Sequence, residues 1–197
     1  MKKLLLITVA AVAILFAVVV MTHINNVPKL DEEVNATWAQ VQNQYKRRAD
    51  LVPNLVATVK GYASHEKEVL TDVVEARAKV GQTQISPEML SSPDAMKQFE
   101  ANQNALGSAL SRLLLVVERY PDLKADKNFQ ALQSQLEGTE NRIAVARRDY
   151  IAAVQKYNVE LRTVPGRWVA ALFYPDAKQK ESFSASPAEQ EAPKVFF

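Results

Sequence analysis

The sequence contains no cysteine, and only five of its 197 residues are glycine. Without cysteine, the chain cannot form disulfides, use a thiol nucleophile or hold a metal through thiolates. None of the glycines belongs to a Gly-x-Gly-x-x-Gly or P-loop motif, so no phosphate-binding loop is predicted. The formal net charge is only +2, and Lys2 and Lys3 account for it. The neutral remainder lacks the basic face that nonspecific nucleic-acid binding requires, so we expect no nucleic-acid partner.

Histidine is scarce as well. His65 and Glu66 begin the His-Glu-x-x-His zinc motif, but Val69 occupies the position of its second histidine. A Glu-x-x-His pair of the di-iron bundles would need a glutamate where Tyr62 stands. The other histidine, His23, follows the apolar N-terminal segment. We therefore expect no metal, no cofactor and no catalytic residue.

The eighteen residues from Leu4 to Met21 carry no charge and are nearly all apolar. As a helix they would be about 27 Å long, close to the thickness of a bilayer core. A basic start also fits a signal peptide, but the run is long for one and no small-x-small cleavage site follows it. We predict a transmembrane anchor over 4–21, behind a short flank of residues 1–3. The positive-inside rule compares Lys2 and Lys3 with Lys29 and places the N-terminus in the cytoplasm and the bulk of the chain outside it.

Apolar residues then recur every three or four positions, and no window alternates as a strand would. This pattern predicts an all-α chain in which residues 27–175 form an antiparallel four-helix bundle with a short terminal helix. The expected helices are 27–49, 51–81, 94–120 and 126–163, with Asp50 and Asp126 as caps. If a helix instead runs through Pro53, the bundle would have three long helices. Residues 176–197 are expected to form an extended tail.

Several ordered motifs resemble the LemA family of bacterial membrane-anchored helical proteins. They are KRRADLVPNLV at 46–56, VKGYASHE at 59–66, YPDLKA at 120–125, EGTENRIA at 137–144 and RRDY at 147–150. The resemblance covers about residues 27–175, and the C-terminal PKVFF also looks like a LemA tail. It implies an N-terminal transmembrane helix and an antiparallel helical bundle, and it implies no established activity. It also implies a topology with the N-terminus outside, opposite to that from the charges.

Glu66 is the polar exception on an otherwise apolar helix seam. Counting turns places it level with residues near 140, which predicts a polar layer of Glu66, Arg112, Thr139 and Glu140. Such a layer would fix the register of the helices. The alternatives are a proton-sensing or ligand site, or a Glu66 that simply reaches solvent.

Three surfaces are candidates for interaction with a partner. They are the basic pair Arg47 and Arg48, the apolar segment with Trp168 and Phe173, and the tail end with Val195 and Phe197. Trp168 and Phe173 would either pack on the end of the bundle, which we favour, or lie at the membrane interface.

The sequence therefore predicts a non-enzymatic scaffold or adaptor in the cell membrane, with one span. Its expected partners are other membrane or envelope proteins, or further copies of itself. The alternatives are a ligand- or pH-sensing module and an enzyme that uses carboxylates in a cleft between helices.

Overall fold

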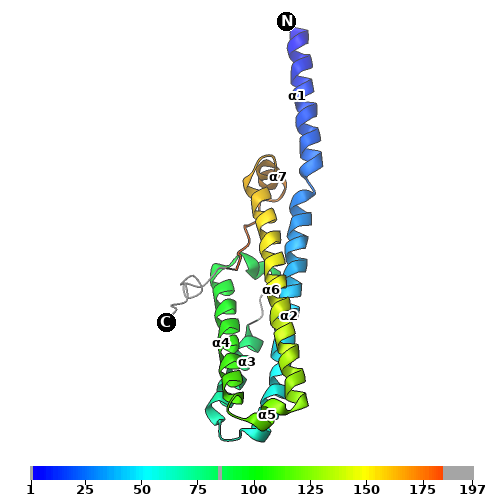
Figure 1. Ribbon diagram of the computed structural model, residues 1–197. Helices are drawn as coiled ribbons and strands as arrows, with labels where there is room; N and C mark the ends of the chain where they lie inside the picture. Colours follow the sequence, from blue (N-terminus) through cyan, green and yellow to red (C-terminus); the bar gives the residue numbers. More distant parts are fainter. Residues whose placement is uncertain (1, 84–85, 184–197) are drawn as a thin grey trace, which may run out of the picture.

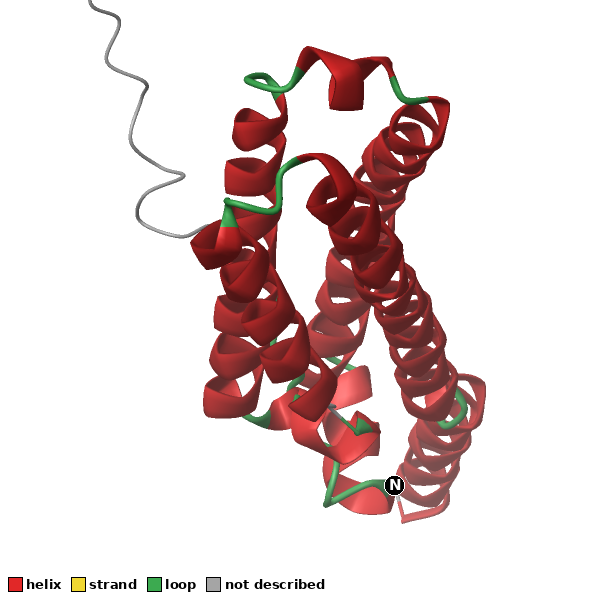
Figure 2. Cartoon of the chain, turned by 90° about the horizontal axis from the view of Figure 1, so that it is seen from below, coloured by secondary structure: helices red, strands yellow, loops and turns green. Residues whose placement is uncertain are grey.

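The computed structural model describes residues 2–83 and 86–183, which are mostly helical and contain no strand. Four long helices form an antiparallel bundle: α2 (Asn26–Tyr62), α3 (Lys67–Gln82), α4 (Pro93–Val117) and α6 (Lys127–Arg162). Short helices follow or connect them: η1 (Pro87–Ser91), α5 (Pro121–Ala125) and α7 (Gly166–Phe173). The predicted all-α bundle is confirmed, and Figure 2 shows its helices from the end opposite to the N-terminus.

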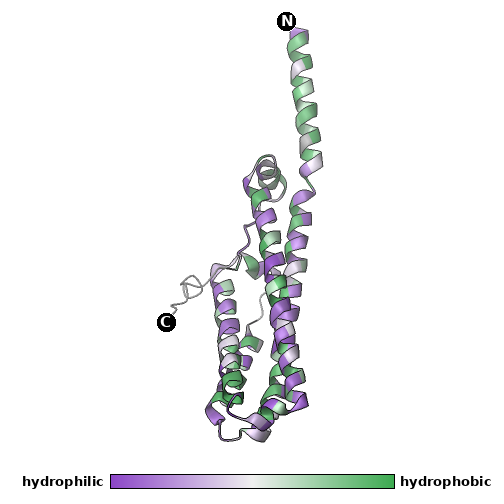
Figure 3. Cartoon of the chain, viewed as in Figure 1, coloured by the Kyte–Doolittle hydropathy of each residue, from purple (hydrophilic) through white to green (hydrophobic). Residues whose placement is uncertain are grey.

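The helix that precedes the bundle, α1 (Lys2–His23), extends beyond it and has its large apolar side chains exposed (Figure 1). Within the described part of the chain, it supplies the one stretch that is long and apolar enough to cross a membrane, with a mean hydropathy of 3.1. Figure 3 shows α1 mostly in the colour of hydrophobic residues, whereas the bundle helices mix hydrophobic and hydrophilic residues, and the uncharged run from Leu4 to Met21 makes α1 apolar all round. Apolar residues all round a helix suit a lipid environment.

The bundle is built on α2 and α6, which lie side by side and run in opposite directions (Figure 1). Three contacts define their register: the rings of Trp38 and Tyr150, the ion pair of Arg48 with Glu140, and the hydrogen bond from the Tyr62 hydroxyl to Asp126. α3 and α4 pack on the half of this pair that is farther from α1 (Figure 1). Asp126 caps α6 as predicted, because its carboxylate accepts from the Phe129 N–H at 2.9 Å.

The predicted helix break at Asp50 is wrong. α2 continues through Pro53 to Tyr62, and the chain reverses at residues 63–66 instead. A proline inside a helix cannot donate to the carbonyl four residues earlier. Here the guanidinium Nε of Arg77 on α3 donates to that carbonyl, Ala49 O, at 2.9 Å. Since Pro53 itself is on an exposed face, α2 accommodates it.

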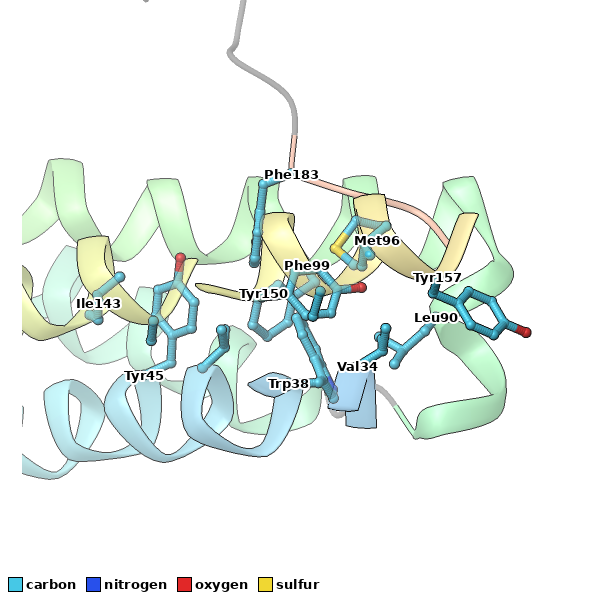
Figure 4. Packing of buried hydrophobic residues seen from close by; sticks show 14 of the residues in the cluster. Val34, Trp38, Tyr45, Leu90, Met96, Phe99, Ile143, Tyr150, Tyr157 and Phe183 are labelled. Carbon is cyan, nitrogen blue, oxygen red and sulfur yellow. The ribbon is translucent and has the colours of Figure 1, made fainter. Parts of the chain in front are cut away.

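Two apolar clusters form the core. The cluster nearer to α1 is rich in aromatic rings: Trp38 lies 5.1 Å from Phe99 and 5.2 Å from Tyr150, and Phe183 packs against Tyr150 (Figure 4). The farther cluster is mostly aliphatic and contains Val52, Leu55, Val59, Val73, Leu106, Leu110, Leu113 and Phe129. Edge-to-face rings and interlocked aliphatic side chains are typical of such interiors.

The segment after α7 is not helical over 176–183, but it is packed against the bundle rather than free. The carboxamide of Asn158 bonds to both the N–H and the carbonyl of Lys180, the Tyr150 hydroxyl donates to Glu181 O, and Phe183 enters the core. Burial raises the pKa of the Tyr150 hydroxyl. The remainder of the predicted tail, 184–197, lies outside the described residues.

Candidate functional site

The four residues of the predicted polar layer do not meet. Glu66 accepts from Arg119 and from the Tyr120 hydroxyl at the far end of the bundle, next to the reversal at 63–66. Arg112 pairs with Asp72 on the surface. The prediction failed because it placed the first helix reversal near residue 50, and that error put Glu66 opposite the middle of α6.

A polar layer does exist, and Arg48 forms its centre. Only 4% of Arg48 is exposed. Its Nη1 donates to Glu140 Oε1 at 3.2 Å, and its Nη2 donates to the backbone and side-chain oxygens of Gln103 at 2.9 and 2.7 Å. The guanidinium also lies 5.0 Å from the centroid of the Tyr45 ring. Two of the predicted residues belong here, because Glu140 is the ion-pair partner and Thr139 is buried beside it, with its hydroxyl donating to Gln135 O.

This layer separates the two apolar clusters of the core. On α2 it lies between Tyr45 and Val52, and on α4 between Phe99 and Leu106, which belong to different clusters. A buried arginine tolerates few arrangements, because its charged guanidinium needs acceptors at fixed positions, and here Nη1 and Nη2 find theirs on α6 and α4. The layer therefore fixes the register of three helices, which is the role that we expected of Glu66.

The layer opens on one side into a cleft of about 600 Å³ between α2, α4 and α6. Its lining includes Tyr45, Arg48, Gln103, Asn104, Ser108, Ser111, Glu140 and Arg147. Burial raises the pKa of the Tyr45 hydroxyl, and the nearby guanidinium groups of Arg147 and Arg48 oppose that rise. The buried Nε of Arg48 has no hydrogen-bond partner. Guanidinium, amide and hydroxyl groups can together bind a small anion.

The far end of the bundle carries a second polar group of residues. Besides its bonds to Arg119 and Tyr120, Glu66 precedes the first turn of α3. The hydrogen bond to Glu66 raises the pKa of the Tyr120 hydroxyl. The Phe129 N–H and, to a smaller extent, the Tyr62 hydroxyl stabilise the Asp126 carboxylate and lower its pKa. These contacts join the end of α2 and the start of α3 to the segment between α4 and α6, so their role is structural.

The predicted interaction surfaces have different outcomes. Arg47 is exposed, as a contact residue must be, but Arg48 is buried and cannot belong to a surface. Trp168 is 55% exposed, so the favoured packing of this ring on the bundle end is wrong, whereas Phe173 is 43% exposed and lines a groove with Val27 and Tyr174. α7 packs instead through smaller residues of its opposite face. Val195 and Phe197 lie outside the described residues.

The comparison with protein families decides the membership of the chain. Residues 37–197 match the model of the LemA family. The chain belongs to the LemA family. The matched residues include Arg48 and Glu140, all of α6 and α7, and α2 from residue 37 onward.

Relatives of this LemA-family chain include proteins named as magnetosome proteins. Magnetosome protein MamQ 1 of Paramagnetospirillum magneticum is 29% identical over 94% of this chain and 73% of its own length. Magnetosome protein MamQ of Magnetospirillum gryphiswaldense is 24% identical over 80% of this chain and 63% of its own length. Protein LemA of Metamycoplasma hominis is 23% identical over 71% of this chain and 59% of its own length.

Sequence reasoning missed Arg48 and Gln103 as members of the polar layer of this LemA-family chain, although a signal was present. Gln103 stands between Phe99 and Leu106 on the apolar seam of α4, and Arg48 stands between Tyr45 and Val52 on that of α2. Both are at the three- and four-residue spacing of buried positions. Arg48 was assigned to the surface because it adjoins two other basic residues in the sequence.

Proposed function

We propose that this protein is a single-pass membrane scaffold whose bundle binds another envelope protein or a second copy of itself. The observation that carries the proposal is an apolar strip on the outer face of α6, formed by Ile151 and Val159. Both side chains are exposed, Val159 by 50%. They border a groove of about 650 Å³ between α6 and the packed segment around Ser182.

The composition of this strip suits a protein partner. Gln155 and Arg162 lie along the same groove as Ile151 and Val159, so the apolar residues have polar neighbours. Protein interfaces commonly combine an apolar centre with a polar rim that contains arginine. The near-zero net charge favours such packing over electrostatic capture of nucleic acid. Arg47 on α2 remains a second candidate contact. The names of the MamQ relatives, as magnetosome proteins, are compatible with a scaffold function at a membrane.

Photocrosslinking in living cells tests the strip. A photoreactive amino acid at Ile151 or Val159 of the full-length chain should yield a defined crosslinked product with one protein. Val145 is the matched control, because it is a valine on the same helix with 48% exposure but borders a different part of the surface. A product of twice the mass would identify self-association. Equal labelling at all three positions would contradict the proposal.

Lys2 and Lys3 favour a cytoplasmic N-terminus and a bundle outside the cytoplasm. A C-terminal alkaline phosphatase fusion should then be active, and a green fluorescent protein fusion should not fluoresce. The reverse pattern would support the topology that the LemA resemblance implied. The full-length chain should also remain with membranes after a high-pH carbonate wash, whereas a soluble product without the first segment would show that the segment is a cleaved signal.

A ligand-sensing function is the second candidate, and the lining of the cleft favours it because two guanidinium groups, those of Arg48 and Arg147, face one carboxylate, that of Glu140. A small anion in the cleft would contact Arg147, which lines the cleft without belonging to the Arg48–Glu140 pair. Inorganic phosphate or succinate should then raise the melting temperature of the full-length protein, and Arg147→Gln should abolish the rise. No shift with either anion would contradict this candidate. The enzyme alternative is less favoured, because Glu140, the carboxylate in this cleft, is occupied by its pair with Arg48.

A further inference from the structure

One face of α7 is apolar and uncovered. Trp168 and Leu172, four residues apart, project from it, and the exposed Val164 lies just before the helix. The opposite face packs on the bundle through Gly166, Val169 and Ala170, which are buried. A short helix with large apolar residues outside and small ones inside is the reverse of a helix that serves only to close a core.

The position of α7 identifies what covers this face. The hydroxyl of Tyr174, the residue after α7, donates to Ile24 O at 2.8 Å. Ile24 lies three residues beyond Met21, the last residue of the apolar run, which is about 5 Å along a helix. Figure 1 shows α7 at the end of the bundle beside the link between α1 and α2, with its turns seen nearly end-on, so the helix crosses the long axis of the bundle.

Further contacts hold this arrangement together. Glu160, near the end of α6, accepts from the Asn26 amide at 3.3 Å and lies 3.5 Å from His23 Nδ1. The residues that follow the apolar run are therefore attached to both α6 and α7. If α1 crosses the bilayer, α7 must lie at the level where the bilayer core ends and the headgroups begin.

We propose that α7 is a second membrane contact, which inserts Trp168 and Leu172 into the interface of the same bilayer that α1 crosses. Tryptophan prefers this interfacial level, and amphipathic helices lie there with their apolar face toward the acyl chains. Arg162 and Arg167 are exposed beside this face and can meet anionic headgroups, with Asp176 as the exposed acid nearby.

The consequence is a bundle attached to the membrane at two points. A single membrane-spanning helix would by itself leave the bundle free to tilt and rotate relative to the bilayer. Contact of α7 with the lipid fixes both motions. The α6 strip of the proposed scaffold then faces a constant direction along the membrane surface, although the contact with lipid does not depend on that function.

Tryptophan fluorescence tests the proposal without disturbing the core. The chain has two tryptophans: Trp38, which is 1% exposed, and Trp168. Trp38 lies twelve residues into α2, or about 18 Å from its start, and is therefore remote from the lipid. The full-length protein is reconstituted into vesicles of phosphatidylethanolamine and phosphatidylglycerol, with or without lipids brominated near the headgroup. Brominated lipid should quench the tryptophan fluorescence of the wild type at least about twofold more than that of Trp168→Phe.

Each other outcome overturns the proposal. Equal quenching of the wild type and Trp168→Phe would show that Trp168 does not touch lipid. Protection of Trp168 from aqueous iodide without quenching by brominated lipid would show that a protein covers α7, and dependence of that protection on protein density would identify a second copy.

Leu172→Ser should lower the quenching of Trp168, whereas Leu115→Ser should leave it unchanged. Leu115 is the matched control because it is as exposed as Leu172 but lies in α4 at the far end of the bundle.

Discussion

Pro53 and Arg77 should be energetically coupled, although they lie on different helices. Proline inside a helix is about 3 kcal/mol less favourable than alanine. The hydrogen bond from Arg77 Nε to Ala49 O replaces the missing backbone bond and recovers about 1 kcal/mol. Alanine also gives the unfolded chain more conformational freedom than proline, which reduces the gain in stability by about 0.5–1 kcal/mol. We therefore expect Pro53→Ala to stabilise the protein by about 1–2 kcal/mol, a rise of roughly 2–8 °C in melting temperature.

The decisive measurement is a double-mutant cycle with Arg77→Met, which keeps most of the aliphatic stem. In the wild type this change leaves Ala49 O without its partner and should cost about 1 kcal/mol. In the Pro53→Ala background the new N–H at position 53 bonds to Ala49 O, so the cost should fall to about 0.3 kcal/mol or less. Thermal unfolding of the full-length chain in detergent, followed by circular dichroism, gives both values. An equal cost of Arg77→Met in both backgrounds would refute the reasoning.

Three further predictions concern the core, the end of α6 and the turn before α7. Leu110→Ala should lower the free energy of unfolding, measured with denaturant, by about 2–5 kcal/mol because Leu110 is 3% exposed. Leu115→Ala, at a 70% exposed leucine on the same helix, should change it by no more than about 0.5 kcal/mol. Because the pKa of Asp126 is lowered below its ordinary 3.8, its carboxylate stabilises the fold above that pH and loses this effect as the pH falls through the lowered pKa. The melting temperature of Asp126→Asn should therefore depend less steeply on pH in this acidic range than that of the wild type. An equal slope for the two proteins would contradict this role of Asp126. Gly166→Ala should destabilise by about 1–3 kcal/mol because its methyl group would collide with the backbone of Glu160, whereas Gly138→Ala, which has room for the methyl group, should be neutral or stabilising in the same melting experiment.

The apolar spacing of the sequence determined the fold class. Four helical segments, the candidate span and the cap at Asp126 all follow from local periodicity and from hydrogen bonds within a few residues. The resemblance to the LemA family implied the same architecture, and the match to the family model confirmed the resemblance.

The position of the first reversal could not be read from this spacing. The reversal at 63–66 takes four residues, about one helical turn, so the apolar positions on either side keep their three- and four-residue steps. Pro53 appeared to be the stronger break, because its tolerance depends on Arg77, which is distant in the sequence. Because the reversal was predicted near residue 50, Glu66 was paired with the wrong residues of the neighbouring helices.

The sequence by itself determined which residues are apolar, where helices are favoured and that one segment suits a membrane. Only the tertiary structure decided that Arg48 is buried with Gln103 and Glu140, and that Trp168 is exposed beside the end of the anchor. The physical reason is that periodicity reports which face of a helix is apolar, a property of neighbouring residues. Which helix covers that face, and whether a charge finds its acceptors there, depends on contacts between residues that are far apart in the chain.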